Sequence, residues 1–149
     1  MTEAPAAGTR LSLDNLGFLL AKASQRWNEL LHQELVAAGF PEVRPAYGYL
    51  LIPLYEQDGL RQGELARRAR LSKQTLTTMA RALERDGLIE RRPDPADARA
   101  TQILLTERAR ELRPVAERIL AELDDHVATM AGAAKQATLK QALRTLIDL

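Results

Sequence analysis

The hydrophobic pattern of this chain changes its period once, and that change restricts the fold more than any other feature. Over most of the sequence, apolar residues recur at the three- and four-residue spacing of one helical face. In the middle the period shortens, because residues 88–92 and 100–105 are short strand candidates separated by a turn-rich loop at 93–98. The sequence therefore predicts a mainly α-helical fold with one small β-hairpin.

Glycine and proline residues bound the first two expected helices. The apolar stripe that begins at Leu13 stops at Gly39, which is expected to cap the first helix. A second helix is expected to begin near Pro45, since proline suits a first helical turn. Pro53 lies inside that helix and removes one backbone hydrogen bond, so we expect it to bend the helix or to end it early.

Capping residues bound the remaining helices. A short helix is expected over residues 60–69, and Ser72 then caps a longer helix that Gly87 ends. After the hairpin, Thr106 is expected to cap a long helix that is broken at Gly132. A last amphipathic helix follows. The predicted order is four helices, a hairpin and two helices.

This order divides the chain into three parts. Residues 1–10 are small and polar, and we expect them to form a disordered arm. Residues 45–105 hold the short helices and the hairpin. Residues 11–44 and 106–149 carry long apolar stripes that need a partner surface, and in so small a chain a second copy can supply it. We therefore expect these two segments to form a helical dimerisation region.

The charges of the chain are distributed unevenly, although the formal net charge is only +1. Residues 61–113 contain thirteen basic and eight acidic side chains, a net charge of +5, and the rest of the chain carries −4. A basic middle between acidic ends is typical of a nucleic-acid-binding module joined to a dimerisation scaffold. Two alternatives are a solvated charged surface and a basic centre in a dimeric helical protein that docks an acidic protein partner.

The helix that begins after Ser72 presents a polar face of unusual composition. At about 100° per residue, its apolar side chains fall on one side, namely Leu76, Met79, Ala80 and Leu83. The opposite side offers hydrogen-bonding groups and cations, namely Gln74, Thr78, Arg81 and Arg85, with Lys73 and Thr77 beside them. Such groups suit base edges and phosphates. The face therefore favours nucleic-acid contact over a solvated helix surface.

The expected hairpin adds a second basic element. Arg91, Arg92 and Arg99 lie at its two bases, where they can reach phosphates or a minor groove. Asp97 repels DNA by its charge, so we expect it to orient Arg99 through a charge-assisted hydrogen bond. The alternative is a turn-stabilising aspartate beside a solvated arginine.

Taken together, these residues resemble the winged helix-turn-helix transcription regulators of the multiple antibiotic resistance regulator (MarR) family. The similarity is carried by residues 63–77, GELARRARLSKQTLT, and by residues 83–92, LERDGLIERR. The most specific part is Asp97-x-Arg99, followed after five residues by Leu105-Thr106, which is similar to the wing signature of the family. The order of elements agrees over nearly the whole chain.

The resemblance implies a winged helix-turn-helix domain at 45–105 and an obligate homodimer built from the terminal helices. It implies that each subunit places the helix after Ser72 in a major groove of double-stranded DNA and its wing in the flanking minor groove. By position, the recognition-helix contacts correspond to Ser72, Lys73, Gln74, Thr75, Thr77, Thr78 and Arg81. The wing contacts correspond to Asp97 and Arg99, with Arg91 and Arg92 beside them. We expect a repressor of a pseudo-palindromic operator.

Relatives of this kind bind small effectors, often aromatic and anionic, in a cavity beside the second helix. The candidate effector-binding residues here are Arg26, Trp27, His32, Tyr47 and Tyr49. Each has an ordinary structural alternative, since Trp27 lies on the apolar stripe and the two tyrosines suit an interface. Pro53 is unusual for the family and bears on the shape of this cavity.

Several classes of protein are disfavoured by the composition. The chain has no cysteine, which excludes structural disulfides and thiolate metal sites. It shows no signal peptide and no apolar run of membrane-spanning length, so a cytoplasmic protein is expected. Glu122 and His126 are one helical turn apart, but two ligands do not make a metal site. The residues show no phosphate loop and no activated nucleophile, so neither an enzyme nor a cofactor is expected.

Overall fold

The computed structural model describes residues 11–149, and the predicted arm at 1–10 lies outside this range. The elements follow one another in the order α1 (Leu16–Ala37), the 3-10 turn η1 (Pro45–Tyr47), α2 (Gly48–Glu56), β1 (Leu60–Arg61), α3 (Gln62–Ala69), α4 (Lys73–Arg85), β2 (Ile89–Pro93), β3 (Thr101–Leu105), α5 (Glu107–Ala131) and α6 (Ala133–Ile147). The mainly α-helical fold with a small sheet is confirmed.

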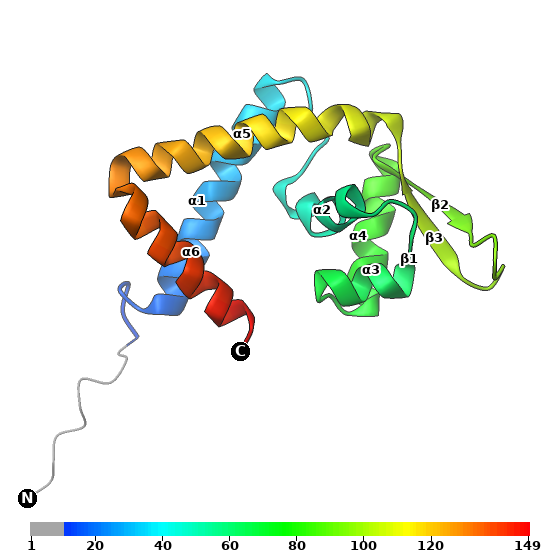
Figure 1. The fold of residues 1–149 in the computed structure, drawn as a ribbon, viewed down its shortest axis with the longest axis horizontal. Helices are drawn as coiled ribbons and strands as arrows, with labels where there is room; N and C mark the ends of the chain where they lie inside the picture. Colours follow the sequence, from blue (N-terminus) through cyan, green and yellow to red (C-terminus); the bar gives the residue numbers. More distant parts are fainter. Residues whose placement is uncertain (1–10) are drawn as a thin grey trace, which may run out of the picture.

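The molecule has two parts joined by the long helix α5 (Figure 1). At one end, α2, α3 and α4 surround the small sheet, and the β2–β3 hairpin projects beyond the helices. At the other end, α1 packs on α5, and α6 turns back sharply from the end of α5 (Figure 1). The helix is interrupted between α5 and α6 at Gly132, as the sequence predicted. The φ of Gly132 is 95°, which is unfavourable for other residues.

The first helix is bounded by side-chain and glycine caps. It begins at Leu16 and not at Leu13, because the Asn15 side chain accepts hydrogen bonds from the amides of Gly17 and Phe18. Leu13 lies before this cap and is exposed. The expected glycine cap at the other end is confirmed, since Gly39 has a φ of 92°.

The second helix differs from the expectation in two ways. It is preceded by the 3-10 turn η1, with Pro45 in its first position. It also runs three residues past Pro53, to Glu56, so the expected early end is wrong. Leu50 and Leu54 are fully buried on either side of Pro53, and this packing offsets the single hydrogen bond that proline removes.

The helix expected over residues 60–69 is in fact a short strand followed by a helix. Leu60 and Arg61 form β1, which pairs antiparallel with β3 so that Leu60 faces Ile103. The sheet therefore has three strands in the order β1-β3-β2. Two residues are too few to show a period of two, so the hydrophobic pattern gave no sign of this strand.

The two expected strands each begin one residue later than predicted. Leu88 is fully buried, but its amide donates to Leu83 O and so closes the end of α4. Ala100 belongs to the connecting loop, since its amide donates to Asp97 O and its carbonyl accepts from Asp94 N. The β2–β3 pairing aligns Ile89 with Leu105.

The hydrophobic core lies mainly in the part that contains the sheet. Leu54 of α2, Leu65 of α3, Leu76 of α4 and Ile103 of β3 are fully buried there. By contrast, α6 contains no buried residue. The core therefore holds α4 and the hairpin in fixed positions relative to each other.

Candidate nucleic-acid interface

Helix α4 starts at a capped end and turns its polar face outward. The Ser72 hydroxyl accepts a hydrogen bond from the Thr75 amide at 3.1 Å, which confirms the predicted cap. Leu76, Ala80 and Leu83 are buried against the core. The opposite face is exposed to solvent and consists of Lys73, Gln74, Thr75, Thr78, Arg81 and Arg85. The inward and outward sides of the helix thus agree with the sequence-based assignment except at Thr77, which was expected beside the polar face and is half-buried.

Thr77 differs from these exposed side chains because it braces α4 against α3. It is half-buried, and its hydroxyl accepts from Gln62 Nε2 at 2.9 Å and donates to Lys73 O at 2.8 Å. Gln62 is the first residue of α3. Thr77 therefore fixes the angle between α3 and α4, and its hydroxyl already has two partners within the protein.

The wing, defined here as β2, β3 and the loop 94–100 between them, carries Arg99 in that loop and not at a base of the hairpin as expected. Asp97 Oδ1 accepts from Arg99 Nε at 3.2 Å and from the Arg99 amide at 3.0 Å, which confirms that this carboxylate orients the guanidinium. The Arg99 side chain is nevertheless 92% exposed. It can thus meet a phosphate or a groove while Asp97 holds its stem.

Arg91 and Arg92 are less exposed than Arg99, although all three arginines pair with a carboxylate. Arg91 binds Glu84 through two hydrogen bonds, Nη2 to Oε1 at 3.0 Å and Nε to Oε2 at 3.2 Å. This contact ties the wing to α4 and holds the pKa of Glu84 below its usual range. Arg92 pairs with Glu90 on the same strand at 2.5 Å and remains largely exposed.

A further ion pair supports the wing loop. It was not predicted from the sequence. Asp94 Oδ2 accepts from Arg61 Nε at 2.8 Å, and Asp94 Oδ1 accepts from the amide of Ala96 at 2.7 Å. Only 10% of the Asp94 side chain is exposed. The Asp94-Pro95 pair signals a turn, but the contact with Arg61 depends on β1, which the hydrophobic pattern missed.

The turn between α3 and α4 contacts the C-terminal end of α6. Arg70 has a φ of 52°, the only positive value among the non-glycine residues of the described chain. Its guanidinium donates to Ile147 O at 2.7 Å and to Asp148 Oδ1 at 3.1 Å. Both partners are exposed, so this contact contributes little stability by itself.

A partly open cavity of about 360 Å³ lies between α1, α2 and α5. We call it the interhelix cavity. Its walls are mostly apolar and aromatic, and they include Trp27, Leu31, Tyr49, Ile52, Tyr55 and Leu112. The segment that precedes α2 closes one side through Arg44, Pro45 and Ala46. A cationic side chain at the edge of an aromatic pocket suits a small anionic aromatic molecule.

Of the five residues expected around such a cavity, two line it and three do not. Trp27 and Tyr49 are in its lining. Arg26 is on the surface of α1, where it pairs with Glu29 at 3.2 Å. His32 is half-buried on α1 outside the lining, and its Nδ1 has no hydrogen-bond partner among the described residues. Tyr47 is buried with its side chain turned toward α4.

The sequence-based list missed Arg44 and Tyr55, which do line the cavity. The Tyr55 hydroxyl donates to Ala109 O at 2.6 Å, and burial raises the pKa of this tyrosine to about 12. Tyr55 follows Tyr49 by six residues on α2, but Tyr47, three residues after Arg44, does not line the cavity, so spacing along the chain does not identify its members. Pro53, expected to bear on the cavity, is not in its lining.

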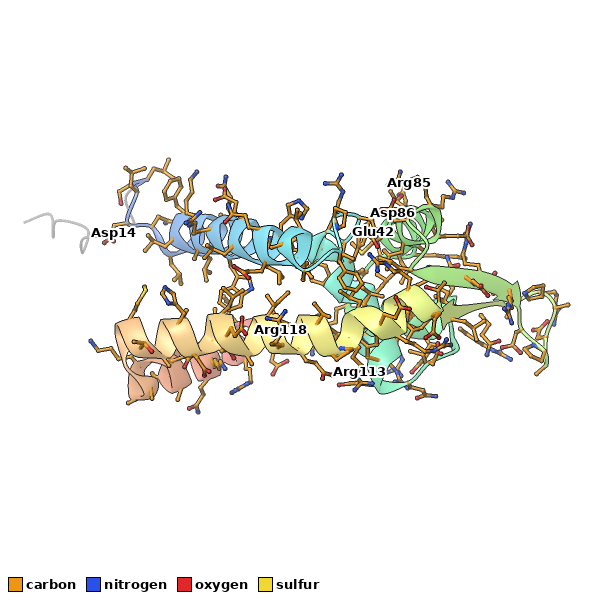
Figure 2. The ribbon with its side chains drawn as sticks, turned by 90° about the horizontal axis from the view of Figure 1, so that it is seen from above. Asp14, Glu42, Arg85, Asp86, Arg113 and Arg118 are labelled. Carbon is orange, nitrogen blue, oxygen red and sulfur yellow. The ribbon has the colours of Figure 1, made fainter. Side chains whose placement is uncertain are left out.

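Tyr47 connects the cavity segment to α4. Its hydroxyl donates to Asp86 Oδ2 at 2.5 Å. Burial and the neighbouring carboxylate raise the pKa of Tyr47, and the same hydrogen bond lowers the pKa of Asp86. Figure 2 shows Asp86 and Arg85 beside Glu42, where the segment that follows α1 meets the end of α4. The contact between Tyr47 and Asp86 was not predicted from the sequence, because 39 residues separate them.

Comparison with known proteins decides the family. A family model described as MarR family matches residues 49–101. An HTH-type transcriptional repressor of Mycobacterium tuberculosis is 30% identical over 132 residues, which are 88% of this chain and 92% of the relative. A repressor of Mycobacterium bovis matches to the same extent. The chain belongs to the MarR family. It is therefore a transcriptional regulator of the winged helix-turn-helix class, as the sequence predicted.

Solved structures of transcriptional regulators agree with the fold. The transcriptional repressor CouR, bound to a 23-mer DNA duplex, has a TM-score of 0.76 and 24% identity, and the match covers 93% of this chain and 99% of that one. A probable transcriptional regulator from Pseudomonas aeruginosa has the same TM-score with 26% identity, covering 89% and 97%. PcaV of Streptomyces coelicolor, in complex with its natural ligand, also gives 0.76, with 21% identity and coverage of 93% and 96%.

The described residues contain neither a membrane-spanning helix nor a cluster of metal-ligating side chains. Among residues 11–149, no helix combines the length and apolar character that crossing a membrane requires. Within the same range, no three histidine, aspartate or glutamate side chains converge as a metal site would require.

Proposed function

We propose that this MarR-family protein is a homodimeric repressor that binds a pseudo-palindromic site in double-stranded DNA and is released by a small aromatic anion. Each subunit inserts α4 into a major groove and the wing into the flanking minor groove. The two half-sites then lie about 34–36 Å apart, one turn of DNA. Residues 45–105 form the DNA-binding domain, and residues 11–44 and 106–149 form the dimerisation region.

The observation that carries the proposal is the combination of an exposed polar face on α4 with an oriented arginine on the wing. Gln74, Thr78 and Arg81 have no structural task that would explain their position, and they offer donors and acceptors for base edges. Arg99 is fixed at its base by Asp97 and is free at its tip. The proposed DNA contacts are Ser72, Lys73, Gln74, Thr75, Thr78, Arg81, Arg92 and Arg99. Thr77, Arg91 and Asp97 are assigned to positioning these contacts.

Dimerisation is supported by the apolar surface of the terminal helices. Leu16 and Leu19 on α1, Met130 on α5, and Leu139 and Ile147 on α6 are all exposed in the single chain. Several exposed large apolar side chains on the helices of one end of a molecule favour an association site there. A second copy covers it with the same residues through a two-fold axis, and that axis sets two α4 helices at a fixed spacing.

Release by a ligand is supported by the interhelix cavity. The cavity places Arg44 beside Trp27, Tyr49 and Tyr55, and this set of side chains suits an aromatic carboxylate. Benzoate is the simplest probe of this class. It is expected to quench the fluorescence of Trp27, the single tryptophan, and Arg44→Ala is expected to weaken this binding.

The experiment that tests the proposal is selection of bound sequences from random duplex DNA by the full chain. The affinity for the best sequence is then measured at several salt concentrations. The logarithm of the binding constant is expected to fall with a slope of about −0.9 per neutralised phosphate. Gln74→Ala is expected to relax the sequence preference at one position of each half-site, because it removes a group that reads a base edge.

The alternative, a basic centre that docks an acidic protein, predicts a different result. A protein of that kind binds poly-L-glutamate as tightly as duplex DNA and selects no sequence. Absence of measurable binding to any duplex at low salt contradicts the proposed function. Selection of a sequence without internal two-fold symmetry contradicts the homodimeric part of it.

A further inference from the structure

We infer that Tyr47 is a positioning residue that couples the interhelix cavity to α4 through its hydrogen bond to Asp86. The inference rests on the proposed function, because it identifies how the state of the cavity reaches the DNA-binding helix. Four features of the structure support it: the cavity wall around Tyr47, the hydrogen bond to Asp86, the groove beside α4, and the short 3-10 turn that holds the tyrosine.

The backbone on both sides of Tyr47 forms one wall of the cavity. Ala46 and Gly48 line the cavity, as does Arg44. The Tyr47 side chain points away from it and is 4% exposed. A molecule that displaces this wall must therefore move a tyrosine that is packed on its other side.

The far end of that tyrosine is attached to the last turn of the DNA-binding helix. Tyr47 donates to Asp86 Oδ2 at 2.5 Å. Asp86 is the C-terminal cap of α4, and its amide donates to Ala82 O at 3.0 Å. Figure 2 places Asp86 beside Glu42 at this junction. Because an α-helix is rigid over 13 residues, a shift of this end tilts the whole of α4.

Tyr47 also lies beside the side of α4 that the proposed function turns toward DNA. Together with Ala46, Gln74, Thr75, Thr78 and Met79, it lines a shallow groove next to the first turns of the helix. A displacement of the tyrosine therefore changes this groove as well as the hydrogen bond to the C-terminal cap of α4.

The segment that holds Tyr47 is suited to move. It forms the 3-10 turn η1, which is only three residues long. A 3-10 turn has poorer hydrogen-bond geometry than an α-helix, so it resists deformation less than α2 does. The helix that follows is anchored by the buried Leu50, Leu51 and Leu54, so motion concentrates in the turn.

Reciprocity provides a test that needs no knowledge of the natural effector. If the cavity biases α4, then DNA bound at α4 must bias the cavity to the same extent. Trp27 lines the cavity and is the single tryptophan of the chain. Acrylamide quenching of Trp27, with and without a saturating duplex from the selection, therefore reports on the cavity from the DNA side.

The decisive variant is Tyr47→Phe, which keeps the buried ring and removes only the hydroxyl. Tyr55→Phe is the matched control, because Tyr55 lines the cavity and its hydroxyl makes a comparably short bond, to Ala109 O of α5. DNA is expected to change the quenching constant of Trp27 by about twofold in the parent and in Tyr55→Phe. The change is expected to be absent in Tyr47→Phe, although this variant still binds DNA.

A pair of variants at Asp86 separates the hydrogen bond from the charge. Asp86→Asn keeps an oxygen that can accept from Tyr47, and is expected to retain the DNA-dependent change. Asp86→Leu cannot accept a hydrogen bond and is expected to lose it. Thermal unfolding of each variant without DNA shows whether it is folded at the temperature of the quenching measurement.

The outcomes distinguish this inference from the function on which it rests. A parent protein that binds no duplex contradicts the proposed function. A parent that binds DNA without any change in Trp27 quenching contradicts the coupling alone. The assignment to Tyr47 is overturned if Tyr47→Phe retains the full change, or if Tyr55→Phe loses it to the same extent.

Discussion

The two ends of this molecule are built on different principles, although similar helices occur in both. Around the sheet, every helix and strand contributes to one core, and Leu54, Leu65 and Leu76 are fully buried. In the terminal helices, α6 has no buried residue and Leu139 is 51% exposed. The first end is complete within one chain, whereas the second presents an apolar surface that is complete only when covered.

This difference explains how one small chain can be both rigid and responsive. The winged-helix end positions α4 and Arg99 through core packing and through contacts such as Arg91 with Glu84 and Arg61 with Asp94. The helical end sets the distance between two such units. Since the interhelix cavity lies where the two ends meet, a ligand there is placed to act on both.

The largest expected effect comes from a charge placed on the open helical surface. Leu139→Asp buries an unpaired carboxylate in the proposed dimer interface, at a cost of roughly 3–5 kcal/mol in each copy. We expect the dissociation constant of the dimer to rise by at least about a thousandfold. Sedimentation equilibrium measures this change.

The control for this comparison is Ile52→Asp on α2. Ile52 is 56% exposed, close to the 51% of Leu139, but it belongs to the winged-helix end. This variant is expected to remain dimeric. If both variants are monomeric, or neither is, the two ends do not differ in the way described above.

A smaller effect is expected from a cavity in the closed core. Leu65→Ala removes a fully buried side chain of α3, and such truncations reduce the free energy of unfolding by about 2–5 kcal/mol. Urea denaturation measures the loss. Because Leu65 lies outside the proposed dimer interface, the loss should be the same at different protein concentrations. A loss below about 1 kcal/mol would mean that α3 repacks freely, and that the core is not what positions α4.

Charge removal from the two ends should affect DNA binding unequally. Arg99→Ala is expected to weaken binding by roughly 1–2 kcal/mol and to reduce the salt slope by about 0.9 if one phosphate contact is lost. Arg26→Ala removes the same charge from α1, where the side chain is 64% exposed, and should change neither value. Fluorescence anisotropy with the selected duplex measures both, and equal effects would favour a diffuse charge interaction over a docked wing.

The smallest effect concerns an exposed ion cluster on α3. Arg67 and Arg68 hold the pKa of Glu64 at about 2, below its usual value of 4.5. A lowered pKa stabilises the folded state above pH 4.5, and that contribution is lost as the pH falls from 4.5 toward 2. The parent should therefore be more stable than Glu64→Gln at pH 7, by an amount that shrinks in this window. Urea denaturation at pH 7 and pH 3 checks it, and a constant difference would contradict the ion-pair origin.

Much of the architecture followed from local signals in the sequence. Five predicted helix ends are confirmed, because capping chemistry and positive φ act within a few residues. They lie at Ser72, Thr106, Gly39, Gly87 and Gly132. The exposed face of α4 and the Asp97–Arg99 contact were also predicted, since helical periodicity and a two-residue separation are both local.

Some misses are local, such as the Asn15 cap that starts α1 after Leu13, but those that concern the sheet and the cavity involve partners that are distant in sequence. β1 exists because Leu60 pairs with Ile103 across the sheet, and two residues show no period of their own. The cavity takes Arg44 and Tyr55 but excludes Arg26 and His32, because membership depends on how α1, α2 and α5 cross. Helical periodicity identifies which residues face inward, but it does not show which neighbouring element they meet.

The sequence by itself determined the helical and hairpin elements, the basic middle of the chain and the MarR family resemblance. Only the tertiary structure decided that Tyr47 turns from the cavity to Asp86, and that Arg91 binds Glu84 while Arg99 stays exposed. The physical reason is the separation along the chain over which each interaction acts. Capping, helical periodicity and charge composition depend on neighbours along the chain, whereas a hydrogen bond across 39 residues depends on where packing of the core places both ends.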